Sequence, residues 1–295
     1  MANAPKFTNG KHSAINIKEL GTVKVTELSA IDHSAIYKIQ HHGVEHDLAL
    51  FLNPAGGKKL FIFFSGAANR KAFTLPVFHR WSWHDQFPGH ALYISDPTLK
   101  RSSTLPLGWY IGDQSSDLNS AMCDIFRAVA RNVGIDHSNI VFYGSSGGGF
   151  ASLRALSEIP SAKAIVINPQ TRLSSFNGNS LKDYLGEFFS GVSVDEFSAR
   201  FPERNEVRFH VDRIEDSRIV YAQCLDDQHH MSLHLPELFT NDSGSIRPRS
   251  LRNCSLVFFN DPRGHAHGEP NELVPILLSK ADGEGSDTLY SGISS

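Results

Sequence analysis

The sequence predicts an α/β fold, with a mostly parallel central sheet and helices on both faces. Short continuous apolar runs, such as residues 60–64 and 164–167, have the length of strands that are buried on both faces. Segments with helical periodicity separate these runs, as in residues 117–133. Strands that alternate with helices form parallel sheets, which bind ligands beyond the carboxyl ends of the strands. The residues that directly follow each strand are therefore where a functional site is expected.

Residues 1–20 are polar and are expected to be loosely ordered, and alternating apolar and polar residues between 22 and 51 predict antiparallel, half-exposed strands. The predicted buried strands are 60–64, 91–94, 140–143, 164–167, 219–225 and 256–259. The predicted helices are 117–133, the segment directly after residue 146, 229–239 and 271–280.

Two segments differ in character from the rest. Residues 172–216 are polar and charged with scattered aromatics, which indicates a cap-like insertion over the sheet, with helices near 181–189 and 194–200. Residues 281–295 are rich in Gly and Ser and are expected to be disordered. The functional site is therefore expected in one domain, residues 21–280.

The composition is that of a soluble globular protein. The 295 residues are 40% hydrophobic and 20% charged, and the net charge of −3 predicts no nucleic-acid partner. Neither a signal peptide nor a membrane span is evident, so a cytoplasmic location is predicted. The three cysteines, in apolar runs without a Cys-x-x-Cys pair, are expected to be buried thiols: Cys123, Cys224 and Cys254. The oligomeric state is left open.

The most informative motif is Gly144-Ser145-Ser146-Gly147-Gly148, between a predicted strand and a predicted helix. This is the Gly-x-Ser-x-Gly pattern of a nucleophile elbow, in which glycines let strand and helix approach and the serine adopts a strained backbone. A phosphate-binding Walker loop would need Gly-Lys-Ser/Thr, and the spacing does not match a dinucleotide fingerprint. The pattern predicts Ser146 as a nucleophile and no cofactor.

A serine nucleophile needs a histidine base and an acid that orients it. Asp227 follows the predicted strand 219–225 and is our choice of acid, with Asp226 as a competitor; helix capping is the alternative role for either. His265 follows the predicted strand 256–259 and is our choice of base, with His267 as a competitor. The order Ser, Asp, His agrees with the elbow motif.

The oxyanion of an acyl-transfer intermediate needs backbone N–H donors. One is expected from Gly147, directly after the nucleophile. The second is expected from the loop after the predicted strand 60–64, where Ala67 is the preferred donor. The small residues of that loop are also consistent with a simple tight turn.

Other residues give weaker signals. Trp81, Trp109 and Tyr110 are candidate stacking platforms for a sugar ring or an apolar acyl group, and packing in the core is an equal alternative. His230 and His234 are four apart on a predicted helix, but Met231 stands where a zinc protease has Glu and no third ligand is evident. No metal is therefore predicted, and His230 is taken as a candidate substrate-binding residue beside Asp227.

Together these motifs resemble the α/β-hydrolase superfamily. The resemblance rests on Tyr143-Gly-Ser-Ser-Gly-Gly-Gly-Phe-Ala-Ser, the Asp227 loop and Gly264-His265. It implies the α/β-hydrolase fold, with Ser146 as nucleophile, His265 as base and Asp227 as acid. The spacing Asp227-x-x-His230-x-x-x-His234, with segments 108–113 and 167–171, is similar to hydrolase-like proteins of capsular polysaccharide biosynthesis. That likeness implies a carbohydrate ester or acyl-transfer setting.

The expected function is that of a serine esterase that forms an acyl-enzyme, with a small-molecule or carbohydrate ester as substrate. Ser65-Gly66-Ala67-Ala68 replaces the His-Gly-Gly-Gly loop of many lipases, which argues against a lipase. Two alternatives stay open. The acyl group could pass to a sugar hydroxyl, as in an acyltransferase, or the chain could be a non-catalytic accessory protein with a vestigial site.

Overall fold

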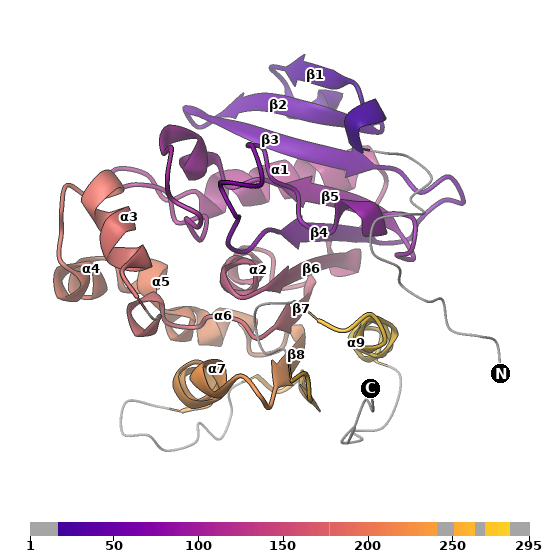
Figure 1. Cartoon of the computed structure of the whole chain (residues 1–295). Coiled ribbons are helices and arrows are strands. Elements are labelled where there is room, and N and C mark those ends of the chain that lie inside the picture. The colour runs from indigo at the N-terminus through magenta and orange to yellow at the C-terminus, as the bar shows by residue number, and fades with distance from the viewer. Residues whose placement is uncertain (1–16, 177, 241–250, 263–268, 284–295) are drawn as a thin grey trace.

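The structure is a computed structural model that describes residues 17–176, 178–240, 251–262 and 269–283. Its centre is one sheet in the order β1-β2-β3-β5-β4-β6-β7-β8-β9 (Figure 1). The strands are β1 Thr22–Val25, β2 Ala35–His41, β3 Val44–Phe51, β4 Leu60–Phe64, β5 His90–Ile94, β6 Ile140–Ser145, β7 Lys163–Ile167, β8 Arg218–Cys224 and β9 Cys254–Phe259. Neighbouring strands from β5 to β9 in that order are parallel, as the sequence predicts.

Helices cover both faces of the sheet (Figure 1). α1 (Asn119–Asn132) and α2 (Gly147–Glu158) pack on one face, where Ile62 and Phe142 of the sheet meet Phe126 and Leu153. α9 (Leu273–Ala281) packs on the other face with Tyr143. Because side chains alternate along a strand, the apolar runs supply both cores at once.

Three expectations about local structure are wrong. β1 pairs with β2 in parallel, because the chain turns through a short 3-10 helix, Leu28–Ala30, and re-enters the sheet in the same direction. β3 is mostly buried rather than half-exposed, because it is paired on both sides, with β2 and with β5. The predicted helix 229–239 is two helices, α7 (Gln228–Leu233) and α8 (Leu235–Phe239), since Pro236 interrupts helical hydrogen bonding.

The predicted insertion, residues 172–216, joins β7 to β8 and gives the sheet no strand in its described residues. Its helices are α3 (Ser180–Phe188), α4 (Val194–Arg200), α5 (Pro202–Asn205) and α6 (Val211–Ile214), with 3-10 turns at Leu173–Ser175 and Val207–His210. In Figure 1, α3 to α5 lie at one side of the sheet, beyond α2. The domain limits themselves stay predictions, and most of residues 1–20 and 281–295 lie outside the described residues.

Two further expectations concern cysteines and membranes. The cysteines are free thiols, of which Cys123 and Cys224 are buried and Cys254 is partly exposed. Among the described residues, no helix has both the length and the apolar character needed to cross a membrane. The cytoplasmic location stays a prediction.

Candidate active site

Ser146 lies at the turn between β6 and α2. Its backbone has φ 54° and ψ −123°, a conformation that is strained for a residue with a side chain. The strain is held by hydrogen bonds: Ser146 N–H donates to Ile167 O at 3.0 Å, and Ser146 O accepts from Gln170 N–H at 3.1 Å. Neighbouring β7 therefore fixes the turn at the carboxyl edge of the sheet.

The glycines around Ser146 are required by close packing. A Cβ on Gly148 would lie 2.5 Å from Phe64 O, and a Cβ on Gly147 would lie 2.7 Å from Leu107 Cδ1. Only glycine lets α2 start this close to β4. The N-terminus of α2, with its free N–H groups and positive dipole end, therefore lies directly after the serine.

The Ser146 hydroxyl has one neighbour that the sequence analysis missed. Gln170 Nε2 donates to Ser146 Oγ at 3.3 Å, and Gln170 Oε1 accepts a hydrogen bond from Trp109 Nε1. Gln170 and Trp109 are fully buried, so each satisfies the other's polar group. Gln170 follows β7, where the rule that sites lie after parallel strands could have indicated it.

The loop after β4, in which we predict the second oxyanion donor, lies beside Ser146. A Cβ on Gly66 would be 3.3 Å from Ser145 O and 3.9 Å from Ser146 Cβ. Ala68 N–H is already used, since it donates to Pro106 O at 2.8 Å. Ala67 is exposed, so within this loop its placement favours it over Ala68 as donor. The oxyanion roles of Ala67 and Gly147 stay predictions.

Asp227 and His230 form a buried pair after β8. His230 Nδ1 is 2.9 and 3.0 Å from the two oxygens of the Asp227 carboxylate. Asp227 also caps α7, since its Oδ1 accepts from His230 N–H at 3.2 Å. The carboxylate that we expect to orient His265 thus contacts another histidine, which the sequence analysis placed beside it only as a substrate-binding candidate.

The competing residues are placed unequally. Asp226 is exposed, and its Oδ2 accepts a hydrogen bond from Asp261 N–H at 2.9 Å. This bond ties the turn after β8 to the loop after β9, and it favours Asp227 as the acid. Both candidate bases, His265 and His267, lie in 263–268, outside the described residues.

A group of aromatic and imidazole rings extends from the nucleophile toward α7. Trp109 contacts Phe176 at a centroid distance of 6.1 Å, and Phe176 contacts His229 at 6.3 Å. The rings of His230 and His234 are 4.8 Å apart. In the part of the chain that is described, the ring nitrogens of His230 and His234 have no third ligand with which they could bind a metal ion. Trp109, His230 and His234 are buried, so they support the site from behind.

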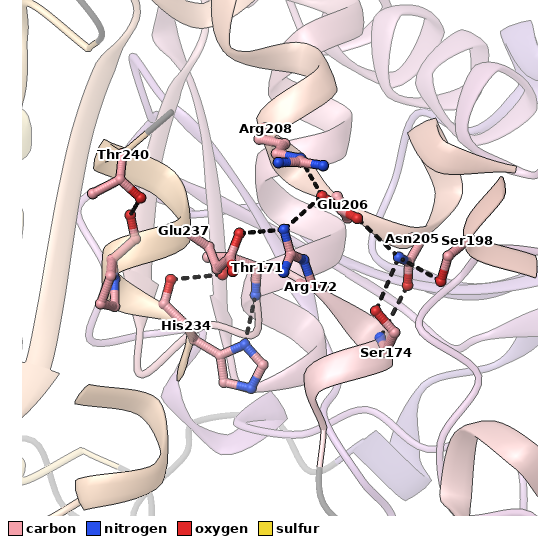
Figure 2. A network of polar contacts seen from close by, with 11 residues as sticks. Thr171, Arg172, Ser174, Ser198, Asn205, Glu206, Arg208, His234, Glu237 and Thr240 are labelled. Atoms are coloured by element: carbon pink, nitrogen blue, oxygen red, sulfur yellow. Dashed lines mark hydrogen bonds and ion pairs between the residues drawn. The ribbon is translucent and has the colours of Figure 1, made fainter. Parts of the chain in front are cut away.

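A polar network joins the insertion to the strand ends (Figure 2). Thr171 N–H donates to His234 Nδ1 at 3.3 Å, and Thr171 Oγ1 donates to His234 O at 2.6 Å. Arg172 forms ion pairs with Glu206 of the insertion at 3.2 Å and with Glu237 of α8 at 2.6 Å. Because Thr171 follows Gln170, these contacts hold the insertion, α8 and the residue that touches Ser146 in one framework.

The other stacking candidates are placed as follows. Tyr110 is buried, and its hydroxyl accepts from Ser65 N–H at 2.8 Å and donates to Ile94 O at 3.0 Å. Its ring therefore presents no surface to a substrate. Trp109 is also buried, although it borders Gly147. Trp81 is half-buried and packs on the core under α9.

Beside Ser145, the neighbour of the candidate nucleophile, lies a buried ion pair that sequence reasoning did not find. Arg80 binds Glu269 through Nε at 2.8 Å and Nη2 at 2.6 Å, and Nη2 also donates to Ser145 Oγ at 2.8 Å. Tyr143 Oη donates to the same carboxylate at 2.7 Å. Burial raises the pKa of Glu269, but the Arg80 charge and these hydrogen bonds outweigh it and leave the pKa below its ordinary value. Glu269, the first described residue after His265 and His267, is thereby attached to β6, which leads to Ser146.

We expect Glu269→Gln to destabilise the protein by about 3–5 kcal/mol, because it leaves the buried Arg80 charge unpaired. The Glu269 side chain is 1% exposed and that of Arg80 is 12% exposed. Urea unfolding measures the loss. The matched control is Asp216→Asn, which removes the partner of Arg252 in a pair that is 68% and 54% exposed and should cost less than about 1 kcal/mol.

The same pair gives a pH dependence. Since folding lowers the pKa of Glu269, its contribution is present above the ordinary value of 4.5 and is lost as the pH falls below it. The stability difference between wild type and Glu269→Gln should therefore shrink below about pH 4.5. At neutral pH, a loss no larger than that of Asp216→Asn would contradict the structural importance of this pair.

Comparisons with known proteins give a likeness of structure rather than of sequence. No family model matches the chain, and no curated protein matches it by sequence. The structure is similar to the capsule O-acetyltransferase of Neisseria meningitidis serogroup A, with a TM-score of 0.54 and 14% identity over 82% of this chain and 94% of that one. It is also similar to the acetyl xylan esterase from Paenibacillus sp. R4, with a TM-score of 0.54 and 16% identity over 90% and 97%.

A third similar structure is the Pyrococcus horikoshii acylaminoacyl peptidase, with a TM-score of 0.57 and 12% identity over 88% of this chain and 42% of that one. At these identities the likeness concerns the fold. The protein has the α/β-hydrolase fold, which confirms the fold that the elbow motif implied.

Proposed function

We propose that the protein is a serine esterase that cleaves an acyl group from a carbohydrate ester through an acyl-enzyme. The observation that carries this proposal is the backbone of Ser146, strained at φ 54° on a strand-to-helix turn with its hydroxyl beside a helix N-terminus. A strained residue costs about 1–3 kcal/mol and persists where the surrounding structure enforces it, as at active sites. In the hydrolase fold, a serine at this turn acts as the nucleophile.

The proposed reaction has two steps. Ser146 Oγ attacks the ester carbonyl carbon while its proton passes to the imidazole of His265, and the N–H groups of Gly147 and Ala67 stabilise the oxyanion. The C–O bond to the alcohol then breaks, and the alcohol takes the proton from the imidazole. In the second step water, activated by the same imidazole, attacks the acyl-enzyme and releases the carboxylic acid and free Ser146.

The choice of a carbohydrate ester is supported by the named activities of similar structures. One is an acetyl xylan esterase and one is a capsule O-acetyltransferase, and both names refer to acetyl groups and carbohydrate. The second name also favours an alternative in which a sugar hydroxyl, rather than water, resolves the acyl-enzyme. Both routes share the first step, so Ser146 has the same role in each.

The fate of the acyl group distinguishes these routes. We expect wild-type protein to react with a fluorophosphonate probe and to release free acetate from an acetylated xylo-oligosaccharide, with most acetate going to water even when unacetylated oligosaccharide is added. Mass spectrometry of the sugars and an acetate assay measure the partition. Predominant transfer to the added sugar would favour the acyltransferase. Absence of both labelling and ester cleavage would favour a non-catalytic accessory protein.

A further inference from the structure

A second group of possible ligand atoms lies away from Ser146, at the β2–β3 hairpin. His41, His42 and Asp124 place one donor atom each within 4.8 Å of one another. His41 ends β2, His42 follows it in the turn of the hairpin, and Asp124 belongs to α1. The hairpin is separated from β6, which carries Ser146, by β5 and β4. Binding at this group would therefore be independent of the proposed function.

The turn brings two adjacent histidines together. Consecutive residues of an extended strand point to opposite faces. His42 and Gly43, however, have φ of 49° and 76°, and the flanking His41 and Val44 are paired. Two positive φ values define a type I′ turn, where Asn-Gly is the preferred pair. With His42 in this conformation, the ring centroids of His41 and His42 are only 4.4 Å apart.

The donor distances fit a metal ion. His41 Nε2 and His42 Nε2 lie 3.6 and 3.5 Å from Asp124 Oδ2. Zinc bonds of about 2.1 Å in tetrahedral geometry separate their donor atoms by about 3.4 Å. His41 Nε2 is shielded from solvent and makes no hydrogen bond to any residue that the structure describes. A direct hydrogen bond would require a shorter contact, whereas a shared ion would satisfy this nitrogen at the distances present.

The remaining carboxylate oxygen is held in place. Arg127 Nη1 lies 3.1 Å from Asp124 Oδ1, one turn along α1. Outer hydrogen bonds of this kind orient ligands in metal sites. The arrangement leaves Oδ2 directed at the histidines and Oδ1 at the arginine.

We propose that His41, His42 and Asp124 bind a divalent transition-metal ion of the Zn²⁺ type. Imidazole and carboxylate are ligands suited to Zn²⁺, Co²⁺ and Ni²⁺, and two histidines argue against Ca²⁺ or Mg²⁺, which take oxygen ligands. Three protein ligands leave the fourth tetrahedral position to water. An ion here cross-links the hairpin to α1 and so stabilises the edge of the sheet that carries β1 and β2.

The test uses the full chain without a histidine tag. Wild type should bind one equivalent of Zn²⁺ by titration calorimetry, and Co²⁺ should give visible absorption typical of tetrahedral coordination. His42→Asn removes a ligand while it creates the preferred Asn-Gly turn, so the variant should fold as well as wild type or better. Asp124→Asn keeps the size of the side chain. Each variant should weaken Zn²⁺ binding by at least about tenfold.

The matched control is His33→Ala. His33 Nδ1 is 2.8 Å from Asp32 in an exposed pair that no third histidine, cysteine or carboxylate joins among the described residues, so its loss should leave Zn²⁺ affinity unchanged. Zn²⁺ should also raise the melting temperature of wild type and of the control, and not that of His42→Asn. Failure of wild type to bind Zn²⁺, or undiminished binding by both His42→Asn and Asp124→Asn, would overturn the proposal and indicate simple ion pairs.

Discussion

Ser146→Ala is expected to slow ester hydrolysis by about 10⁵–10⁶-fold, the loss typical of removing a nucleophile that acts as one unit with its base. The residual rate would come from the oxyanion donors and substrate binding alone. The urea unfolding midpoint should stay close to that of wild type, because alanine keeps the Cβ and removes one hydroxyl bonded only weakly, at 3.3 Å, to Gln170. Steady-state kinetics and fluorophosphonate labelling measure the effect.

Ser145→Ala is the matched control for this change. Ser145 is the adjacent residue of the same turn, and its hydroxyl accepts from Arg80 at 2.8 Å rather than facing Gln170. We expect it to cost about 1–3 kcal/mol of stability and less than about tenfold in rate, because Arg80 keeps its bonds to Glu269. Equal rate losses in the two variants, or labelling of Ser146→Ala, would refute Ser146 as the nucleophile.

The parts of this site that could be predicted from sequence are local. A strand, a glycine-bracketed serine and a helix occupy consecutive residues, so the motif carries its own structural context. The candidate acid, Asp227, could be chosen because it follows a predicted strand, and in the structure it lies shortly after β8. Strand positions could likewise be predicted, since an apolar run such as Leu60–Phe64 must be buried on both faces.

The parts that could not be predicted depend on contacts between distant residues. Arg80 and Glu269 are 189 residues apart, and neither belongs to a recognisable motif. Ser145 occupies a variable position of the elbow motif, so its bond to Arg80 had no local signal. The direction of β1 depends on how the chain returns to the sheet, which periodicity does not specify. Gln170 could be predicted only in part. Its position after β7 indicates a residue of the site, whereas nothing in the sequence indicates its contact with Ser146.

Substitution of each candidate residue should identify the base. We expect His265→Ala to slow hydrolysis by about 10⁵–10⁶-fold and Asp227→Asn by about 10⁴-fold, since one removes the base and the other its orienting charge. His267→Ala should lower the rate by less than about tenfold, as expected for a histidine that is not the base.

His230→Ala is the most informative comparison, because His230 already contacts both Asp227 oxygens, at 2.9 and 3.0 Å. We expect an intermediate loss of about 10–100-fold, through misplacement of the carboxylate rather than loss of the base.

Double variants separate a base from a supporting residue. Residues that act as one catalytic unit are not additive, so Ser146→Ala with His265→Ala should be no slower than Ser146→Ala alone. The pH–rate profile gives a second criterion: His230→Ala should keep the lower limb that reports the base, whereas His265→Ala should abolish it. If His230→Ala instead shows the large, non-additive loss and His265→Ala does not, the buried imidazole three residues after Asp227 is the base. Hydrolysis would then use an acid at the N-cap of α7 and a base within α7, without the segment that precedes Glu269.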